Sequence, residues 1–250
     1  MFKNEKIKEL QLLKENYRGE TVLVIGGLLL AAGSLPFWFF LFWSGQVNKA
    51  DFNKYIFIVL IITTTGLLDD IAGSKNSKGL RGHFGSLMEG KLTTGIIKVI
   101  AISFTTLLIV FSEEALSLQE KIINSGIIIL MSNFLNLLDL RPGRSIKFFL
   151  IISFSILKRA DNWLYFLPYY LPMLPYLPFE LRGLVMLGDA GANLLGFVLG
   201  YNLVNSIISL EAKYLVLLAL LFLTLLSERH SYTSIIEKNR VLKWLDNLGR

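Results

Sequence analysis

The chain has 250 residues, of which 53% are hydrophobic, with a mean hydropathy of +0.56 and a formal net charge of +6. This apolar content lies in repeated long runs, which excludes an ordinary soluble domain and predicts a membrane protein. The absence of Cys excludes disulfides and thiolate metal sites, and only two His argue against a His-rich zinc site. Positive charge in such a protein indicates basic cytoplasmic loops rather than nucleic-acid binding.

The first twenty residues are polar and have no apolar core, so we expect a cytoplasmic N-terminal segment and not a cleavable signal peptide. The rest predicts a single domain, an all-α integral membrane protein with a transmembrane bundle over 21–227 and a cytoplasmic amphipathic tail over 228–250. Since a spanning helix needs about twenty apolar residues, about eight are expected. They cover 21–43, 52–69, 93–111, 121–138, 146–158, 162–179, 190–208 and 212–227.

Two of these runs are irregular. The run at 146–158 is short, which is more typical of a buried or re-entrant helix than of a full span. The run at 162–179 contains four prolines, so we expect that helix to be kinked or broken.

An even number of spans places both termini on one side of the membrane. Most of the 25 Lys and Arg residues lie on that side, so the positive-inside rule makes it cytoplasmic. Every polar motif that could take part in catalysis or binding also falls there. A transporter needs access from both faces and binding groups near the midplane, so this one-sided arrangement favours an enzyme.

The run at 52–69 ends in the doublet Asp69-Asp70, and a glycine-rich basic loop containing Lys78 follows. Carboxylates at a membrane edge are costly unless they are paired, hydrated or metal-bound. Mg²⁺ is held by one or two carboxylates together with substrate phosphates. The doublet therefore predicts a metal and phosphate site, although a solvated helix end remains the plain alternative.

A second polar stripe closes the run at 121–138. Asn133, Asn136 and Asp139 recur every three residues and share a helix face, and Arg141 and Arg144 follow. Such groups are costly in lipid, so we expect them to face a polar cavity. Hydrogen bonding between helices is the alternative.

Three further residues have two interpretations each. Asp189, flanked by glycines at the start of the run at 190–208, is an N-cap or a metal ligand. Arg18 is a topology anchor or a phosphate contact. His230 is a solvated side chain or the one base in its segment that titrates near neutral pH.

In this order, the motifs resemble the polyprenyl-phosphate N-acetylhexosamine-1-phosphate transferase family (glycosyltransferase 4, phospho-N-acetylmuramoyl-pentapeptide-transferase-like), membrane enzymes of cell-wall and surface-glycan synthesis. The resemblance covers residues 16 to about 230. It is carried by Asn16-x-Arg18-Gly19 before a Gly-Gly helix, Asp69-Asp70 with a downstream Lys78-Gly79-Leu80, Asn133-x-x-Asn136-Leu137-x-Asp139, and Gly188-Asp189-x-Gly191 before Leu195-Gly196.

The resemblance implies that undecaprenyl phosphate, or another polyprenyl phosphate, attacks the β-phosphorus of a UDP-N-acetylhexosamine and releases UMP at the cytoplasmic face of the cell membrane. Mg²⁺ is the implied cofactor, with Mn²⁺ as a substitute, and the family suggests a homodimer. The implied metal ligands are Asp189 and Asp69, and the catalytic residues are Asp69, Asp70 and Asp139. The expected substrate-binding residues are Arg18, Lys78, Asn133, Asn136, Arg141, Arg144 and His230.

The chain also departs from the family pattern. Pro142 stands where a second Asp is usual, a His-rich final loop is reduced to His230, and the first and last spans of a ten-helix fold are missing. Three alternatives stay open. They are a catalytically lapsed relative that binds lipid or nucleotide, a transporter supported by the intramembrane Lys98, and a CDP-alcohol phosphotransferase, whose Asp cluster is absent.

Overall fold

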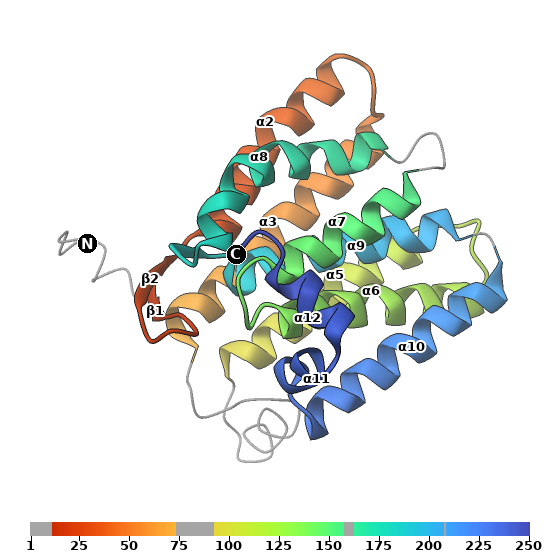
Figure 1. Cartoon of the computed structure of the whole chain (residues 1–250). Coiled ribbons are helices and arrows are strands. Elements are labelled where there is room, and N and C mark those ends of the chain that lie inside the picture. The colour runs from red at the N-terminus through yellow and green to blue at the C-terminus, as the bar shows by residue number, and fades with distance from the viewer. Residues whose placement is uncertain (1–11, 74–92, 158–162, 208) are drawn as a thin grey trace.

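The computed structural model describes residues 12–73, 93–157, 163–207 and 209–250, and this part of the chain is a bundle of α-helices (Figure 1). Each apolar run expected to span the membrane contains a helix. The helices are α2 (Gly26–Trp43), α3 (Lys49–Ala72), α5 (Thr94–Phe111), α6 (Leu118–Leu138), α7 (Arg144–Ile156), α8 (Trp163–Leu181), α9 (Gly188–Ser206), α10 (Leu210–Arg229), α11 (Tyr232–Lys238) and α12 (Arg240–Asn247). The predominantly helical fold is confirmed.

By length and hydropathy, five helices in the described part of the chain could cross a membrane, namely α2, α3, α5, α6 and α10. Their outward faces are apolar, as exposed Phe40, Phe104 and Phe222 illustrate. Several apolar helices with apolar outer faces indicate a membrane protein. The expectation of about eight spans with cytoplasmic termini stays a prediction.

A small sheet near the N-terminus was not predicted. Its strands are β1 (Leu13–Glu15), β2 (Thr21–Val24) and β3 (Val185–Met186), in the order β1-β2-β3. β1 and β2 are antiparallel, while β2 and β3 are parallel. The expected helix over 21–43 is therefore wrong at its start, because Thr21-Val22-Leu23-Val24 is rich in β-branched residues and forms a strand. The helix begins at Gly26.

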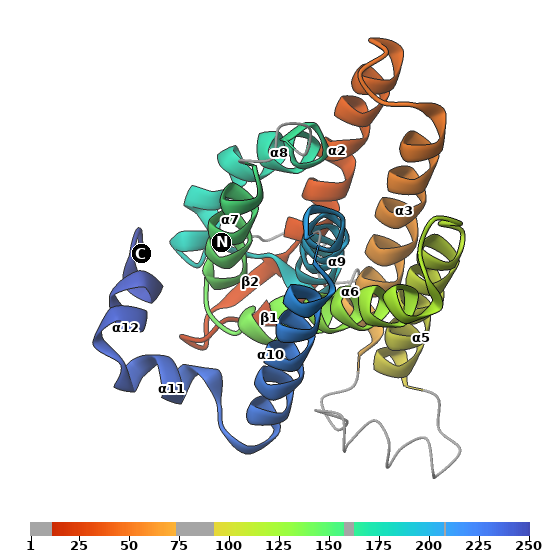
Figure 2. The same ribbon diagram turned by 90° about the vertical axis from the view of Figure 1, so that its right-hand side faces the viewer.

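Helix α9 forms the centre of the bundle, with α2, α3, α6 and α7 packed around it (Figure 2). Nearly all of its residues are buried. Two glycines let its neighbours approach closely. A Cβ atom at Gly66 of α3 would overlap the backbone of Ala190, and one at Gly27 of α2 would overlap the backbone of Gly191. The start of α9 is thereby held against the end of α3, where Asp69 and Asp70 lie.

The two irregular runs form helices. The short run gives α7, whose 13 residues agree with its expected length. The proline-rich run gives α8, a single helix with Pro168, Pro172, Pro175 and Pro178 inside it, so the helix is not broken, and the expected kink stays a prediction. These prolines recur every three or four residues and share one face, which confines the missing backbone donors to that face.

The tail forms two short helices that fold back onto the bundle (Figure 1). Asp246 of α12 receives two hydrogen bonds from the guanidinium of Arg144, at 2.9 and 3.0 Å, and further bonds from Arg250. The Lys147 ammonium donates to the main-chain carbonyls of Leu245 and Asp246. The tail is therefore docked on α7 by polar contacts.

Candidate active site

Asp70 is the most deeply engaged carboxylate of the site. Its side chain is almost fully buried at the end of α3 and accepts backbone hydrogen bonds from Asp189 and Ala190, both at 3.1 Å. The N-terminus of a helix carries unpaired N–H groups and a partial positive charge, which a carboxylate stabilises. The Lys14 ammonium, from β1, lies 3.0 Å from Asp70 Oδ1. Asp70 thus ties three elements together.

Asp139 approaches the same helix end from α6. Its Oδ2 accepts the backbone N–H of Gly188 at 3.2 Å. Gly188 has φ +75°, and a Cβ atom there would lie 2.7 Å from Asp70 Oδ2. Only glycine suits this position. Burial, followed by the nearby carboxylates of Glu180, Asp189 and Asp70, raises the pKa of Asp139 well above its usual value.

Asp69 and Asp189 share a cation supplied by the chain itself. The Lys98 ammonium of α5 lies 2.6 Å from Asp69 Oδ2 and 2.8 Å from Asp189 Oδ2. The Thr94 hydroxyl, one helical turn earlier, donates to Asp69 Oδ1 at 2.6 Å. The four aspartates singled out in the sequence therefore gather around the first turn of α9.

Sequence reasoning missed three of these partners. Lys98 was considered only as evidence for a transporter, and neither Thr94 nor Lys14 was singled out. One signal was available, because an intramembrane lysine needs a counter-charge and the nearest motif rich in carboxylates is Asp69-Asp70.

The asparagines open onto a separate space. Asn133 and Asn136 line a cavity of about 220 Å³ between α5, α6 and α10, together with Lys98 and Asn193. Thr224, Ser227 and Glu228 of α10 also line it. The rest of its wall is apolar, with Val99, Ile102, Ile129, Leu130 and Leu137. Lys98 thus stands at the junction of this cavity with the pair Asp69 and Asp189.

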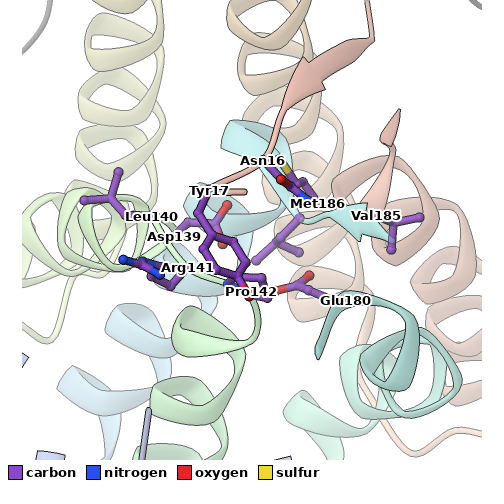
Figure 3. A pocket seen from close by; sticks show the side chains of 10 residues that line it. Asn16, Tyr17, Asp139, Leu140, Arg141, Pro142, Glu180, Val185 and Met186 are labelled. Carbon is purple, nitrogen blue, oxygen red and sulfur yellow. The ribbon is translucent and has the colours of Figure 1, made fainter. Parts of the chain in front are cut away.

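Asp139 faces a different hollow, on the side of the sheet and α8 (Figure 3). Its volume is about 20 Å³, enough for about one water molecule. Arg141 lies over the ring of Tyr17, with its Cζ 4.6 Å from the ring centroid, and Glu180 lines the wall. The stripe of two asparagines and an aspartate therefore serves two cavities instead of one.

The expected substrate-binding residues are dispersed. Arg18 donates to the Tyr17 hydroxyl at 2.8 Å, and Arg141 pairs with Glu237 at 3.4 Å. Arg144 is buried in its contact with Asp246, and His230 is exposed at the end of α10. Neither of these two lines the cavities beside the aspartates.

Lys78 lies outside the described residues. Its role as a substrate contact, like the roles of the four dispersed residues, stays a prediction.

The donors of the cluster suit a hard divalent cation. Among the described residues, no group of three or more His, Cys, Asp or Glu side chains is placed to hold a metal ion. Two carboxylates, Asp69 and Asp189, nevertheless converge on one point, which the Lys98 ammonium fills. Mg²⁺ needs only one or two carboxylates when phosphates and water complete its shell. Comparison of the chain with family models, with curated proteins and with solved structures gave no match.

Proposed function

We propose that this protein transfers a sugar 1-phosphate from a UDP-N-acetylhexosamine to a polyprenyl phosphate, such as undecaprenyl phosphate, and releases UMP. The observation that carries the proposal is the gathering of Asp69, Asp70, Asp139 and Asp189 around the start of α9. They come from three stretches of sequence that are far apart. A fold that only needed a helix cap would not require four carboxylates there.

The site belongs at one membrane interface. The ends of α3 and α6 and the starts of α5 and α9 meet at the carboxylates. The sequence assigns most Lys and Arg residues to the loops at this end, so we propose that it lies in the cytoplasm and that the protein lies in the cell membrane. A nucleotide sugar would approach from the cytosol, while a lipid phosphate would enter between helices with its chain in the bilayer.

The reaction is a displacement at phosphorus. An oxygen of the lipid phosphate forms a bond to the β-phosphorus while the bond from that phosphorus to the bridging oxygen breaks, and UMP leaves with the bridging oxygen. A phosphate monoester is largely dianionic at neutral pH, since its second pKa is about 6. The acceptor therefore needs alignment and charge neutralisation more than a strong base.

Each aspartate has a role that its contacts support. Asp69 and Asp189 would hold Mg²⁺ or Mn²⁺, which supplies charge neutralisation at the phosphates. Asp70 and Asp139 orient the first turn of α9 through its backbone N–H groups. Both Asp69 oxygens accept hydrogen bonds, from Thr94 and Lys98. This engagement favours direct displacement over a covalent phospho-aspartate.

The test is UMP release by purified protein in detergent, given undecaprenyl phosphate, Mg²⁺ and a panel of UDP-N-acetylhexosamines. Asp69→Asn and Asp189→Asn are each expected to reduce the rate by about a hundredfold or more. Asp51→Asn, the same change at the opposite end of α3, is the matched control and should retain the rate. No release from any donor by a folded, Mn²⁺-binding protein would contradict the proposal.

One observation favours a second candidate, a catalytically lapsed relative that binds nucleotide or lipid. Lys98 already engages both carboxylates expected to hold the metal. If that arrangement is permanent, the protein binds ligands without turnover. Nucleotide binding that is insensitive to divalent cations, together with no UMP release, would support this candidate.

A further inference from the structure

Lys98 lies between two environments of opposite character. On one side its ammonium contacts Asp69 and Asp189, at 2.6 and 2.8 Å. On the other side the same residue lines the cavity that contains the amides of Asn133 and Asn136. Its exposed fraction is only 9%. Thr224, Ser227 and Glu228 of α10 line the same cavity, so a carboxylate also stands on this side of the ammonium.

The charge balance of this group is incomplete. One ammonium serves two carboxylates, Asp69 and Asp189, while the nearby Asp70 has its own lysine, Lys14. By formal charge, two aspartates thus have one lysine between them. Close carboxylates repel each other and attract a second cation, and the same field repels an anionic substrate.

We propose that Lys98 and a divalent cation are alternative partners of Asp69 and Asp189, and that Lys98 binds the substrate phosphate once the cation has replaced it. The lysine then turns into the cavity beside Asn133 and Asn136, where its ammonium and their amides can donate to phosphate oxygens. Its flexible four-carbon stem permits this movement while α5 stays in place. Only the identity of the phosphate rests on the proposed function, since the exchange of cations does not.

This exchange explains why the lysine is near two ligands without blocking them. In the absence of a divalent cation, Lys98 offsets the repulsion between two partly buried carboxylates. With the cation in place, the displaced ammonium adds positive charge where an anionic group must bind. Metal and phosphate binding then become linked, because each favours the same position of the lysine.

The first test measures Mn²⁺ affinity by electron paramagnetic resonance of the detergent-solubilised protein, without lipid or nucleotide. Removal of a competing cation should tighten the site, so Lys98→Met is expected to bind Mn²⁺ about tenfold more tightly than the native chain. Lys14→Met is the matched control, because it removes the same charge from the same cluster but leaves Asp69 and Asp189 unchanged. It should change the affinity by less than about threefold.

A second measurement uses the unaltered protein and avoids any failure of a variant to fold. Mass spectrometry would follow acetylation of Lys98 by an amine-reactive reagent. Mn²⁺ is expected to increase the labelling, and inorganic phosphate added with Mn²⁺ is expected to reduce it again. The proposal would be overturned if Mn²⁺ and phosphate left the extent of Lys98 acetylation unchanged. A folded Lys98→Met protein with native Mn²⁺ affinity would also overturn it.

The two proposals fail in different ways. If the protein releases UMP but Lys98→Met does not change its Mn²⁺ affinity, the proposed transferase activity stands and the proposed cation exchange is wrong. If Lys98→Met binds Mn²⁺ more tightly but the native protein releases no UMP from any donor, the proposed cation exchange stands and the proposed transferase activity is wrong.

Discussion

Two groups of charged side chains occupy opposite ends of α3 and α9, and they are organised differently. At the far end, the Lys54 ammonium contacts Glu113 at 2.6 Å, the Tyr201 hydroxyl at 2.9 Å and Asp51 at 3.7 Å. The Tyr165 hydroxyl donates to Asp51. These groups lie beside a stack of aromatic rings that includes Trp38 and Tyr55, with centroids 4.4 Å apart.

The near end has the four aspartates, two lysines and a cavity of about 220 Å³. At the far end, the contacts of Lys54, Asp51 and Glu113 hold helices together, and aromatic side chains cover the charges. At the near end, one lysine serves two aspartates beside a cavity. Polar groups whose hydrogen-bond and ion-pair partners are all present stabilise a structure. A binding site instead keeps some polar groups available for its ligand. The difference agrees with the proposal that the near end binds the substrates.

The largest effect should follow the loss of the carboxylate that fixes α9. Asp70→Ala removes two charge-assisted hydrogen bonds and leaves the α9 N-terminus without them, so the free energy of unfolding should fall by about 3 kcal/mol. Asp51→Ala on the same helix should cost about 1 kcal/mol or less. SDS titration in mixed micelles would measure both. Equal losses would contradict the contrast between the two ends.

The close approach of α3 to α9 gives the next effect. Gly66→Ala places a methyl group against the backbone of Ala190, which cannot move aside, so we expect a loss of about 1–3 kcal/mol. Gly126→Ala is the control, since its new methyl meets only a flexible end of Leu217, at 2.9 Å. That control should be close to neutral, because Ala is also the better helix former. The same titration reports both values.

A smaller effect is expected at the far cluster. Lys54→Met leaves Glu113, which is partly exposed, able to take up water, so the stability loss should be about 1 kcal/mol. Its Mn²⁺ affinity should equal that of the native chain. A change of tenfold or more in Mn²⁺ affinity would mean that the two ends are coupled and that the far end is not independent of the proposed metal site.

The smallest effect concerns the docked tail. Burial acts to raise the pKa of Asp246, but hydrogen bonds from Arg144 and the charges of Arg144 and Arg250 hold it below its usual value. The charged form is therefore favoured in the docked state. Its stabilisation is complete above the ordinary Asp pKa of about 3.9 and is lost as the pH falls through the lower pKa of the docked state.

Relative to its cleavage of an unfolded reference substrate at the same pH, an acid-active protease such as pepsin should cleave the tail faster below about pH 3.9 than at pH 5. Asp246→Asn should remove most of that dependence and raise cleavage at pH 5. Thr233→Val, which removes one weaker contact to Arg144 at 3.3 Å, serves as the control. A tail whose cleavage is the same in both variants would show that Asp246 does not hold it.

Sequence patterns predicted the helices well because long apolar runs are a local signal. They also identified Asp69, Asp70, Asp139 and Asp189, because carboxylates at the ends of apolar runs are unusual. The strands were missed, since segments of three, four and two residues are too short to show a period.

The pairings could not be predicted for a different reason. Lys98 is 29 residues from Asp69 and 91 from Asp189, and Arg144 is 102 residues from Asp246. Nothing local specifies such contacts, because they depend on how the helices pack. The division of Asn133, Asn136 and Asp139 between two cavities has the same origin.

The parallel pairing of β2 with β3 has a consequence for the biogenesis of the protein. Leu23 and Val24 find their partners in Val185 and Met186, which the ribosome makes more than a hundred residues later. Asp70 likewise gains its helix terminus only when Asp189 and Ala190 have been synthesised. Most of the bundle is therefore translated before the carboxylate end can close. A nascent chain halted before β3 lacks the partners of both β2 and Asp70, so this end of the bundle cannot close while the chain is that short.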